Sequence, residues 1–215
     1  MKDIIKVPFG VYYDEQFGRP IRKKRDIVQF ILNVVSVVLI KQESEVQRTL
    51  WIKKEKMNRV FCFLSDKYFS TVFPFEIETR AEENYRVYDP NSNTEIDNRK
   101  IALMERMLDL IDFEGKTVED IIEEAYLDVA VEGYTGDEVD QCFGLVLRLL
   151  TMELGYIRYD YDPKNFKGRI HPLHHMDINY SSVGTYKLGL TRKIQMEEFV
   201  DMLDVKTECR YIQGL

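Results

Sequence analysis

The sequence predicts an α+β fold with a mainly antiparallel sheet. Strand-like segments fill much of the first ninety residues, helical periodicity dominates from 98 to 154, and strand-like segments return after Gly155. Runs of strands followed by runs of helices are typical of α+β domains. The predicted sheet combines an N-terminal meander with C-terminal strands, packed with a central group of about three helices. We expect a single domain over residues 1–215, with 89–98 as the place where it would divide.

The N-terminal half begins with an expected extended segment over residues 1–13. A helix follows over 27–38, where apolar residues recur at a spacing of three or four after Asp26, a candidate N-cap. Segment 89–98, DPNSNTEIDN, consists of turn-forming residues and is the clearest loop. Between the helix and this loop, four β-like segments separated by polar turns predict an antiparallel meander: residues 48–54, 58–65, 71–79 and 85–89.

The hydrophobic period changes after residue 98. Helices are expected at 98–112, 117–131 and 136–154, and Gly155 stands where a C-cap glycine belongs. The expected elements after it are strands at 156–162, 169–180 and 185–191, a helix at 195–204 and a short strand at CRYI, residues 209–212. We expect the three longer strands to be adjacent and antiparallel in the main sheet.

Composition restricts the function classes. A net charge of −7 argues against a general nucleic-acid-coating protein, although a local basic groove remains compatible with it. One basic run is a candidate for phosphate contact, although such a run is more often a solvated loop or helix start. It contains Arg19, Arg22, Lys23, Lys24 and Arg25.

The cysteines and the apolar segments bear on the compartment. Three widely spaced cysteines without a CxxC motif form neither a disulfide framework nor a zinc–thiolate site, and they suit a reducing compartment. The N-terminus lacks the apolar stretch of a secretory signal. The longest apolar run, 27–40, contains polar residues and is shorter than the roughly 20 residues that span a bilayer. We therefore expect a cytoplasmic protein without membrane contact.

All three histidines lie within five positions of one segment, RIHPLHHMDINY. Alternate side chains share a face of a strand, so His171, His175 and Asp177 are expected on one face. His174 is expected among apolar residues on the opposite face, where it packs into the core. The histidine segment is therefore the best candidate for a functional site.

The spacing sets limits on what this face can bind. His171 and His175 are about 13 Å apart on a regular strand, whereas His175 and Asp177 are about 7 Å apart and can converge. A bend at Pro172 would bring His171 back toward them. Together with Asp160 on the preceding predicted strand, these residues are candidate catalytic groups, either as ligands of a divalent metal or as an imidazole–carboxylate pair for acid–base chemistry.

Nearby cations are candidates for binding an anionic substrate such as a phosphodiester. They are Arg158, Lys167, Arg169 and Lys187. The structural alternative is that the histidines pack or hydrogen-bond internally, since no defined metalloenzyme spacing such as HExxH is present.

The segments YIRYDYDP, HPLHHMDINY and YKLGL, with a helix ending in FVDMLD, resemble the C-terminal half of an uncharacterised bacterial domain family. That family has an Arg-x-Asp strand followed by a His-Pro-x-x-His-x-His/Asp segment, and the resemblance covers residues 140–212. Asp177 stands where such families have a third histidine. The resemblance implies a bacterial or phage protein linked to restriction or phage conflict. It marks Arg158, Asp160, His171, Pro172, His174 or His175, and Asp177.

Two functions follow as hypotheses. The first is a non-catalytic partner or regulator in a larger complex in phage defence, favoured by the acidic balance, the abundant aromatic residues and the absence of a strong catalytic motif. It implies a protein partner or an oligomer. The alternative is a His/Asp-dependent, metal-assisted phosphodiesterase or nuclease, with nucleic acid as a partner. The alternative requires His171, His175, Asp177 and Asp160 to converge, whereas the first expects them to be hydrogen-bonded internally or to lie at an interface.

Overall fold

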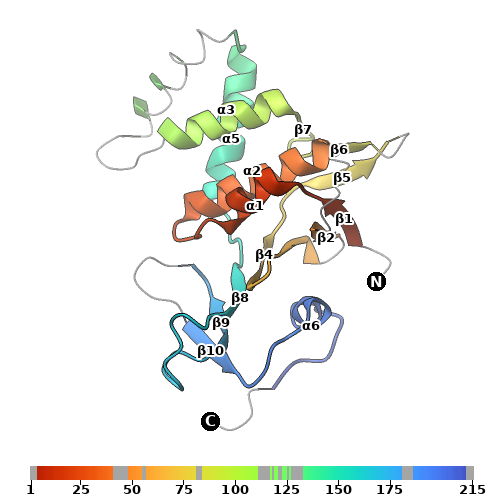
Figure 1. Ribbon diagram of the computed structural model, residues 1–215. Helices are drawn as coiled ribbons and strands as arrows, with labels where there is room; N and C mark the ends of the chain where they lie inside the picture. The colour runs from red at the N-terminus through yellow and green to blue at the C-terminus, as the bar shows by residue number, and fades with distance from the viewer. Residues whose placement is uncertain are drawn as a thin grey trace. The chain divides into compact units, whose positions relative to one another are not determined.

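The computed structural model describes most of the chain. The described residues are 4–40, 48–54, 57–80, 84–110, 117, 119–120, 123–124, 126, 133–180 and 186–211. They belong to two compact units, each with its own sheet (Figure 1). The expectation of a single domain stays a prediction. No helix among the described residues has the length and apolar character needed to cross a membrane.

The first unit comprises residues 1–23, 42–74 and 154–215 and contains a seven-stranded sheet. Every neighbouring pair is antiparallel, in the order β1-β2-β3-β4-β8-β9-β10. The predicted α+β class with a mainly antiparallel sheet is therefore confirmed, as is the adjacency of the three C-terminal strands. The strands are β1 (Ile4–Pro8), β2 (Thr49–Lys53), β3 (Arg59–Phe63), β4 (Lys67–Val72), β8 (Ile157–Tyr161), β9 (His174–Ile178) and β10 (Tyr186–Leu190).

One face of this sheet carries an aromatic core. Phe61 of β3, Tyr159 of β8 and Met176 of β9 are almost fully buried there. Helix α6 (Met196–Asp201) covers them and inserts Phe199, whose ring centroid lies 6.2 Å from that of Phe61 in an edge-on arrangement. The predicted helix at 195–204 is thus present in a shorter form. Residues 209–211 form no strand, and residue 212 of the predicted CRYI strand lies outside the described residues.

The prediction of an extended segment through residue 13 is wrong beyond β1. Residues Val11–Gly18 form helix α1, which begins after the extended Gly10. Tyr13 and Phe17 lie one turn apart, and both are buried, with their ring centroids 5.6 Å apart. This i, i+4 aromatic pair stabilises a helix that the short polar sequence around it did not indicate.

The predicted strand at 71–79 is also wrong, because it joins two strands of different sheets. Strand β4 ends at Val72, and β5 (Glu76–Thr79) belongs to the second unit. Pro74 lies between them, and proline has no N–H to donate to a sheet ladder. The predicted four-strand meander is therefore split, since only its first part joins the seven-stranded sheet.

The second unit comprises residues 24–41 and 75–153. Its three-stranded sheet consists of β5, β6 (Tyr85–Tyr88) and β7 (Glu95–Ile96), the last of which falls inside the predicted loop 89–98. Three of the predicted helices are confirmed, and the predicted helix at 117–131 lies largely outside the described residues. The confirmed helices are α2 (Lys24–Leu39), α3 (Asn98–Leu110) and α5 (Gly136–Thr151).

Candidate functional site

The pairing of β8 with β9 brings the candidate acidic residues and one histidine together. In this register Asp160 lies opposite His175, and Arg158 lies opposite Asp177. Residues two apart on a strand point to the same face, so all four side chains lie on the face opposite the aromatic core. Strand β10 extends this face, because Lys187 lies opposite Asp177.

Arg158 joins the two carboxylates. Its Nε donates to Oδ2 of Asp160 at 2.7 Å, and its Nη2 donates to Oδ2 of Asp177 at 2.5 Å. Burial alone would lower the pKa of Arg158, but the carboxylates, Asp160 first, hold it above its ordinary value. The guanidinium of Arg158 thus neutralises buried charge within the site, and its binding of an anionic substrate stays a prediction.

His175 is 1% exposed, and its ring orientation is fixed by the backbone. Its Nδ1 lies 2.9 Å from the carbonyl oxygen of Pro172. A carbonyl only accepts hydrogen bonds, so Nδ1 carries a proton, and Nε2 is the ring nitrogen left to face Asp160. Nε2 is 3.6 Å from Oδ2 of Asp160. This arrangement is the one that metal-binding histidines usually have.

Gly189 of β10 makes room for the proline that fixes this histidine. It lies opposite His175 in the β9–β10 register. A Cβ atom added at Gly189 would lie 3.0 Å from Cγ of Pro172, closer than such atoms normally approach. The absence of a side chain at this position therefore lets Pro172 lie over β10 and place its carbonyl against Nδ1 of His175.

Asp160, His175 and Asp177 can each offer one ligand atom, and these atoms all lie within 4.8 Å of one another. Asp177 is 2% exposed, and its Oδ1 has no hydrogen-bond partner among the described residues. A buried carboxylate oxygen without a partner is costly, and a bound cation would satisfy it. One imidazole nitrogen with two carboxylates is a donor set that suits divalent ions such as Mn²⁺ or Zn²⁺.

His171 lies beside this donor set without joining it. Its ring centroid is 4.7 Å from that of His175, so the chain does bend back at Pro172. Its Nε2 is 3.0 Å from Oδ2 of Asp162, and its Nδ1 is 3.2 Å from Nζ of Lys187. Both ring nitrogens are therefore engaged by groups other than the two carboxylates of the donor set.

Asp162 is a member of the site that the sequence did not indicate as such. Burial opposes its charge, but hydrogen bonds from Asn165 and from His171 lower the pKa of Asp162 to about 2. The DPKN segment is a typical turn sequence, and it could have indicated the role of Asp162. An aspartate at the start of such a turn often accepts a hydrogen bond from the backbone N–H of the residue three positions later. Asp162 accepts from the backbone N–H of Asn165 at 3.1 Å in this way.

His174 lies on the opposite face, as the alternation predicts. It is partly buried, its Nδ1 lies 2.8 Å from the hydroxyl of Tyr159, and its ring stacks on that of Tyr161. Burial lowers the pKa of His174, and the nearby positive charge of Lys193 lowers it further.

The remaining predicted anion-binding residues are distributed as follows. Lys167 and Arg169 are exposed on the loop between β8 and β9, and Lys187 lies at His171. In the basic run 19–25, Lys24 donates to the backbone carbonyl of Met152 and Arg25 pairs with Asp109. Lys24 and Arg25 thus make their contacts within the second unit. Phosphate contact by the run stays a prediction.

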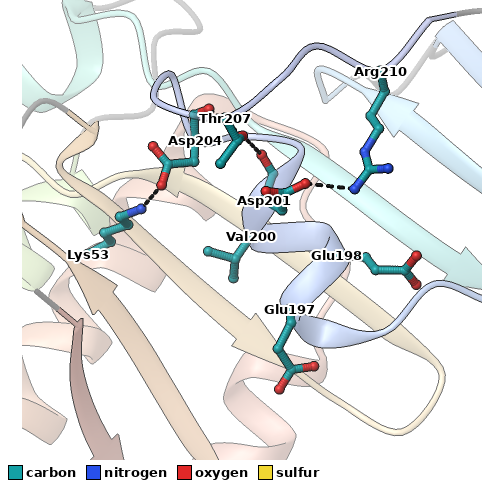
Figure 2. A pocket seen from close by; sticks show the side chains of 8 residues that line it. All are labelled: Lys53, Glu197, Glu198, Val200, Asp201, Asp204, Thr207 and Arg210. Atoms are coloured by element: carbon teal, nitrogen blue, oxygen red, sulfur yellow. Dashed lines mark hydrogen bonds and ion pairs between the residues drawn. The ribbon is translucent and has the colours of Figure 1, made fainter. Parts of the chain in front are cut away.

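A separate hollow of about 370 Å³ lies at α6 (Figure 2). Its walls carry paired charges: Lys53 with Asp204, and Arg210 with Asp201 at 2.7 Å. It shares no residue with the donor set. The residues around it are Lys53, Glu197, Glu198, Val200, Asp201, Asp204, Thr207 and Arg210.

Comparison with known proteins gives no match to a family model, to a curated protein or to a solved structure. This outcome is consistent with an uncharacterised family, and the bacterial or phage origin stays a prediction. The geometry of Asp160, His175 and Asp177 therefore carries the functional argument.

Proposed function

We propose that Asp160, His175 and Asp177 bind one divalent metal ion, and that the protein uses it to hydrolyse a phosphodiester bond. The observation that carries this proposal is the unpaired Oδ1 of Asp177, which is buried beside a histidine whose Nδ1 is held by the carbonyl of Pro172 and whose other ring nitrogen is free to bind a metal when neutral. A site that serves only the fold would be expected to satisfy this oxygen within the chain.

The charge balance supports a divalent ion. Asp160 and Asp177 contribute two negative charges, and Arg158 contributes one positive charge. A divalent ion would make this group positive by one unit, which attracts an anionic substrate. Lys187 lies on the same face, where its ammonium group is placed to contact phosphate oxygens.

The number of ligands supports catalysis. Three protein ligands leave coordination positions open, as in catalytic metal sites, and an ion held there makes a bound water a stronger nucleophile at neutral pH. Asp160 is the most exposed of the three, with 15% of its side chain accessible, so its side is the one from which water would enter. In the reaction, a water oxygen bonds to phosphorus while the bond to the departing alcohol oxygen breaks. The alcohol oxygen gains one proton, and the water loses one to solvent.

Calorimetric titration of the purified protein with Mn²⁺ and Zn²⁺ tests binding, and cleavage of bis(4-nitrophenyl) phosphate tests hydrolysis. We expect one ion per chain and metal-dependent cleavage, both abolished by His175→Gln and by Asp177→Asn. His174→Gln is the matched control, because this adjacent histidine faces the other way, and it should retain both properties.

Each failure has a distinct meaning. Absence of metal binding by the wild-type protein would overturn the proposal entirely. Metal binding without cleavage of any phosphodiester would overturn the catalytic part and favour the non-catalytic role as a partner or regulator.

A further inference from the structure

The loop between β8 and β9 is basic in an acidic protein. The whole chain has a net charge of −7, yet between Asp162 and Leu173 there are three cations and no acid. Lys164, Lys167 and Arg169 are all exposed. A local concentration of lysine and arginine is the electrostatic signature of a surface that binds a polyanion.

The same loop exposes two large apolar side chains among these cations. Phe166 is 54% exposed and Ile170 is 86% exposed. An aromatic ring flanked by cations is the combination that binds single-stranded nucleic acid, since the ring stacks on a base while the cations contact phosphates. The bases of a duplex are already stacked and are not available to such a ring.

The loop is held in shape by its own hydrogen bonds. The N–H of Asp162 donates to the carbonyl of Leu173 at 3.0 Å, and Nδ2 of Asn165 donates to Oδ2 of Asp162 at 2.9 Å. Gly168 adopts a positive φ of 58°, and the N–H of Ile170 donates to the carbonyl of Lys167 at 3.2 Å. A surface that is already ordered loses less conformational entropy when a ligand binds.

The loop also ends at the donor set. Its last residues include His171, which contacts the ring of His175 and lies 3.2 Å from Nζ of Lys187. A strand bound along the loop would therefore bring its phosphates toward the carboxylates and the histidine.

We propose that the β8–β9 loop, residues 162–173, binds single-stranded nucleic acid through Lys164, Lys167 and Arg169 and through stacking on Phe166. This inference deepens the proposed function, on which its choice of substrate rests, by naming single-stranded nucleic acid as the phosphodiester. Binding itself does not require the metal.

The test is fluorescence anisotropy of a labelled fifteen-nucleotide oligo(dT), with EDTA present so that no cleavage occurs. Lys164→Glu combined with Lys167→Glu should weaken binding at least tenfold. It should also flatten the dependence of log affinity on log salt by about 1.4, because each lost phosphate contact on a single strand accounts for about 0.7. Phe166→Ala should weaken binding about tenfold, and a duplex of the same length should bind at least tenfold more weakly.

The matched control is Lys193→Glu combined with Lys206→Glu. It makes the same change in net charge at two exposed residues of the same unit that lie outside the loop. Its affinity should stay within twofold of the wild-type value. Circular dichroism spectra confirm that each variant is folded.

Four results would overturn the inference: no binding by the wild-type protein, equal weakening by the two charge-reversal variants, no effect of Phe166→Ala, or equal affinity for the duplex. Titration with Mn²⁺ distinguishes a failure of the nucleic-acid inference from a failure of the proposed metal-dependent hydrolysis. Intact metal binding and cleavage of bis(4-nitrophenyl) phosphate without oligonucleotide binding would sink the inference alone.

Discussion

On one face of the β8–β9 pair, Tyr159 and Met176 pack into an aromatic core beneath Phe199 of α6. On the other face, His175 and Asp177 are equally inaccessible, with 1% and 2% exposure, but they are polar. The apolar face is satisfied by contacts within the chain. The polar face is not, since Oδ1 of Asp177 has no partner among the described residues. The two faces are equally buried, but only the polar face has a buried polar atom without a hydrogen bond. We infer that the apolar face stabilises the fold and that the polar face is prepared for a ligand.

Breaking the apolar face should have the largest effect. Phe199 is fully buried, so Phe199→Ala leaves a cavity and should lower the free energy of unfolding by about 3–5 kcal/mol. Urea denaturation followed by circular dichroism measures this change. The folded variant should still bind Mn²⁺ with nearly wild-type affinity, because the opposite face is unchanged. Loss of metal binding in the folded state would show that the two faces are not independent.

Breaking the polar face should remove the stabilisation that a metal provides. At a free metal concentration about one hundred times the dissociation constant, a ligand specific for the folded state raises the free energy of unfolding by about 2.7 kcal/mol. We expect this increase for the wild-type protein and none for Asp177→Asn at the same concentration. Thermal denaturation with and without Mn²⁺ measures both. An equal metal-dependent increase in the variant would contradict the assignment of Asp177 as a ligand.

An ion pair that is well shielded from solvent joins the segment after α6 to the sheet. Lys53 of β2 and Asp204 have only 14% and 12% of their side chains exposed, and Lys53 lowers the pKa of Asp204 (Figure 2). Asp204→Asn leaves the ammonium group without its charged partner and should cost about 1–3 kcal/mol in urea denaturation. Asp201→Asn is the control, because its partner Arg210 is 58% exposed, and it should cost less than about 1 kcal/mol. Equal costs would show that the shielding of the pair is unimportant.

A smaller effect should sharpen the role of the backbone in orienting His175. Gly189→Ala forces Pro172 to shift by a few tenths of an ångström, which lengthens the hydrogen bond to Nδ1 of His175. We expect metal affinity to fall about three- to tenfold in calorimetric titration. Adding Pro172→Ala removes the Cγ atom that would be crowded and keeps the carbonyl, so the double variant should recover most of the affinity. If the double variant bound the metal more weakly than Gly189→Ala alone, Gly189 would not act on His175 through Pro172.

The smallest expected effect distinguishes the two adjacent histidines. The pKa of His174 is below its ordinary value of 6.5, because burial and the nearby charge of Lys193 disfavour the protonated form. The unfolded chain therefore takes up this proton first, so stability is complete above about pH 6.5 and declines as the pH falls through that value. His174→Gln should reduce this decline, as measured by denaturation between pH 7.5 and 5. A His174 pKa above 6.5 by NMR titration would contradict the assignment.

The sequence predicted the structure correctly where the short-range periodicity of apolar residues determines the helices and the faces of the strands. Alternation along the strand correctly predicted that His174 and His175 face opposite ways, and three predicted helices are confirmed. It failed at α1, where two aromatic residues one turn apart stabilise a short helix, and at Pro74, where one apparent strand is two.

The site itself depends on contacts between strands, and these could only partly be predicted. The placement of Asp160 opposite His175 depends on the register of β8 with β9, which the sequence does not fix. For the same reason the pairing of Arg158 with both carboxylates was not foreseen. His171 does lie close to His175, as expected. Its hydrogen bond to Asp162 could not be predicted, because it depends on the conformation of the β8–β9 loop.

The most direct test of the central claim is a crystal structure of the protein soaked in Zn²⁺, with anomalous diffraction measured at the zinc edge. We expect one anomalous peak about 2 Å from Nε2 of His175 and from one oxygen each of Asp160 and Asp177, since zinc–nitrogen and zinc–oxygen bonds have this length. A peak-free site with an ordered water on Oδ1 of Asp177 would contradict the claim, because the buried oxygen would then be satisfied without a metal.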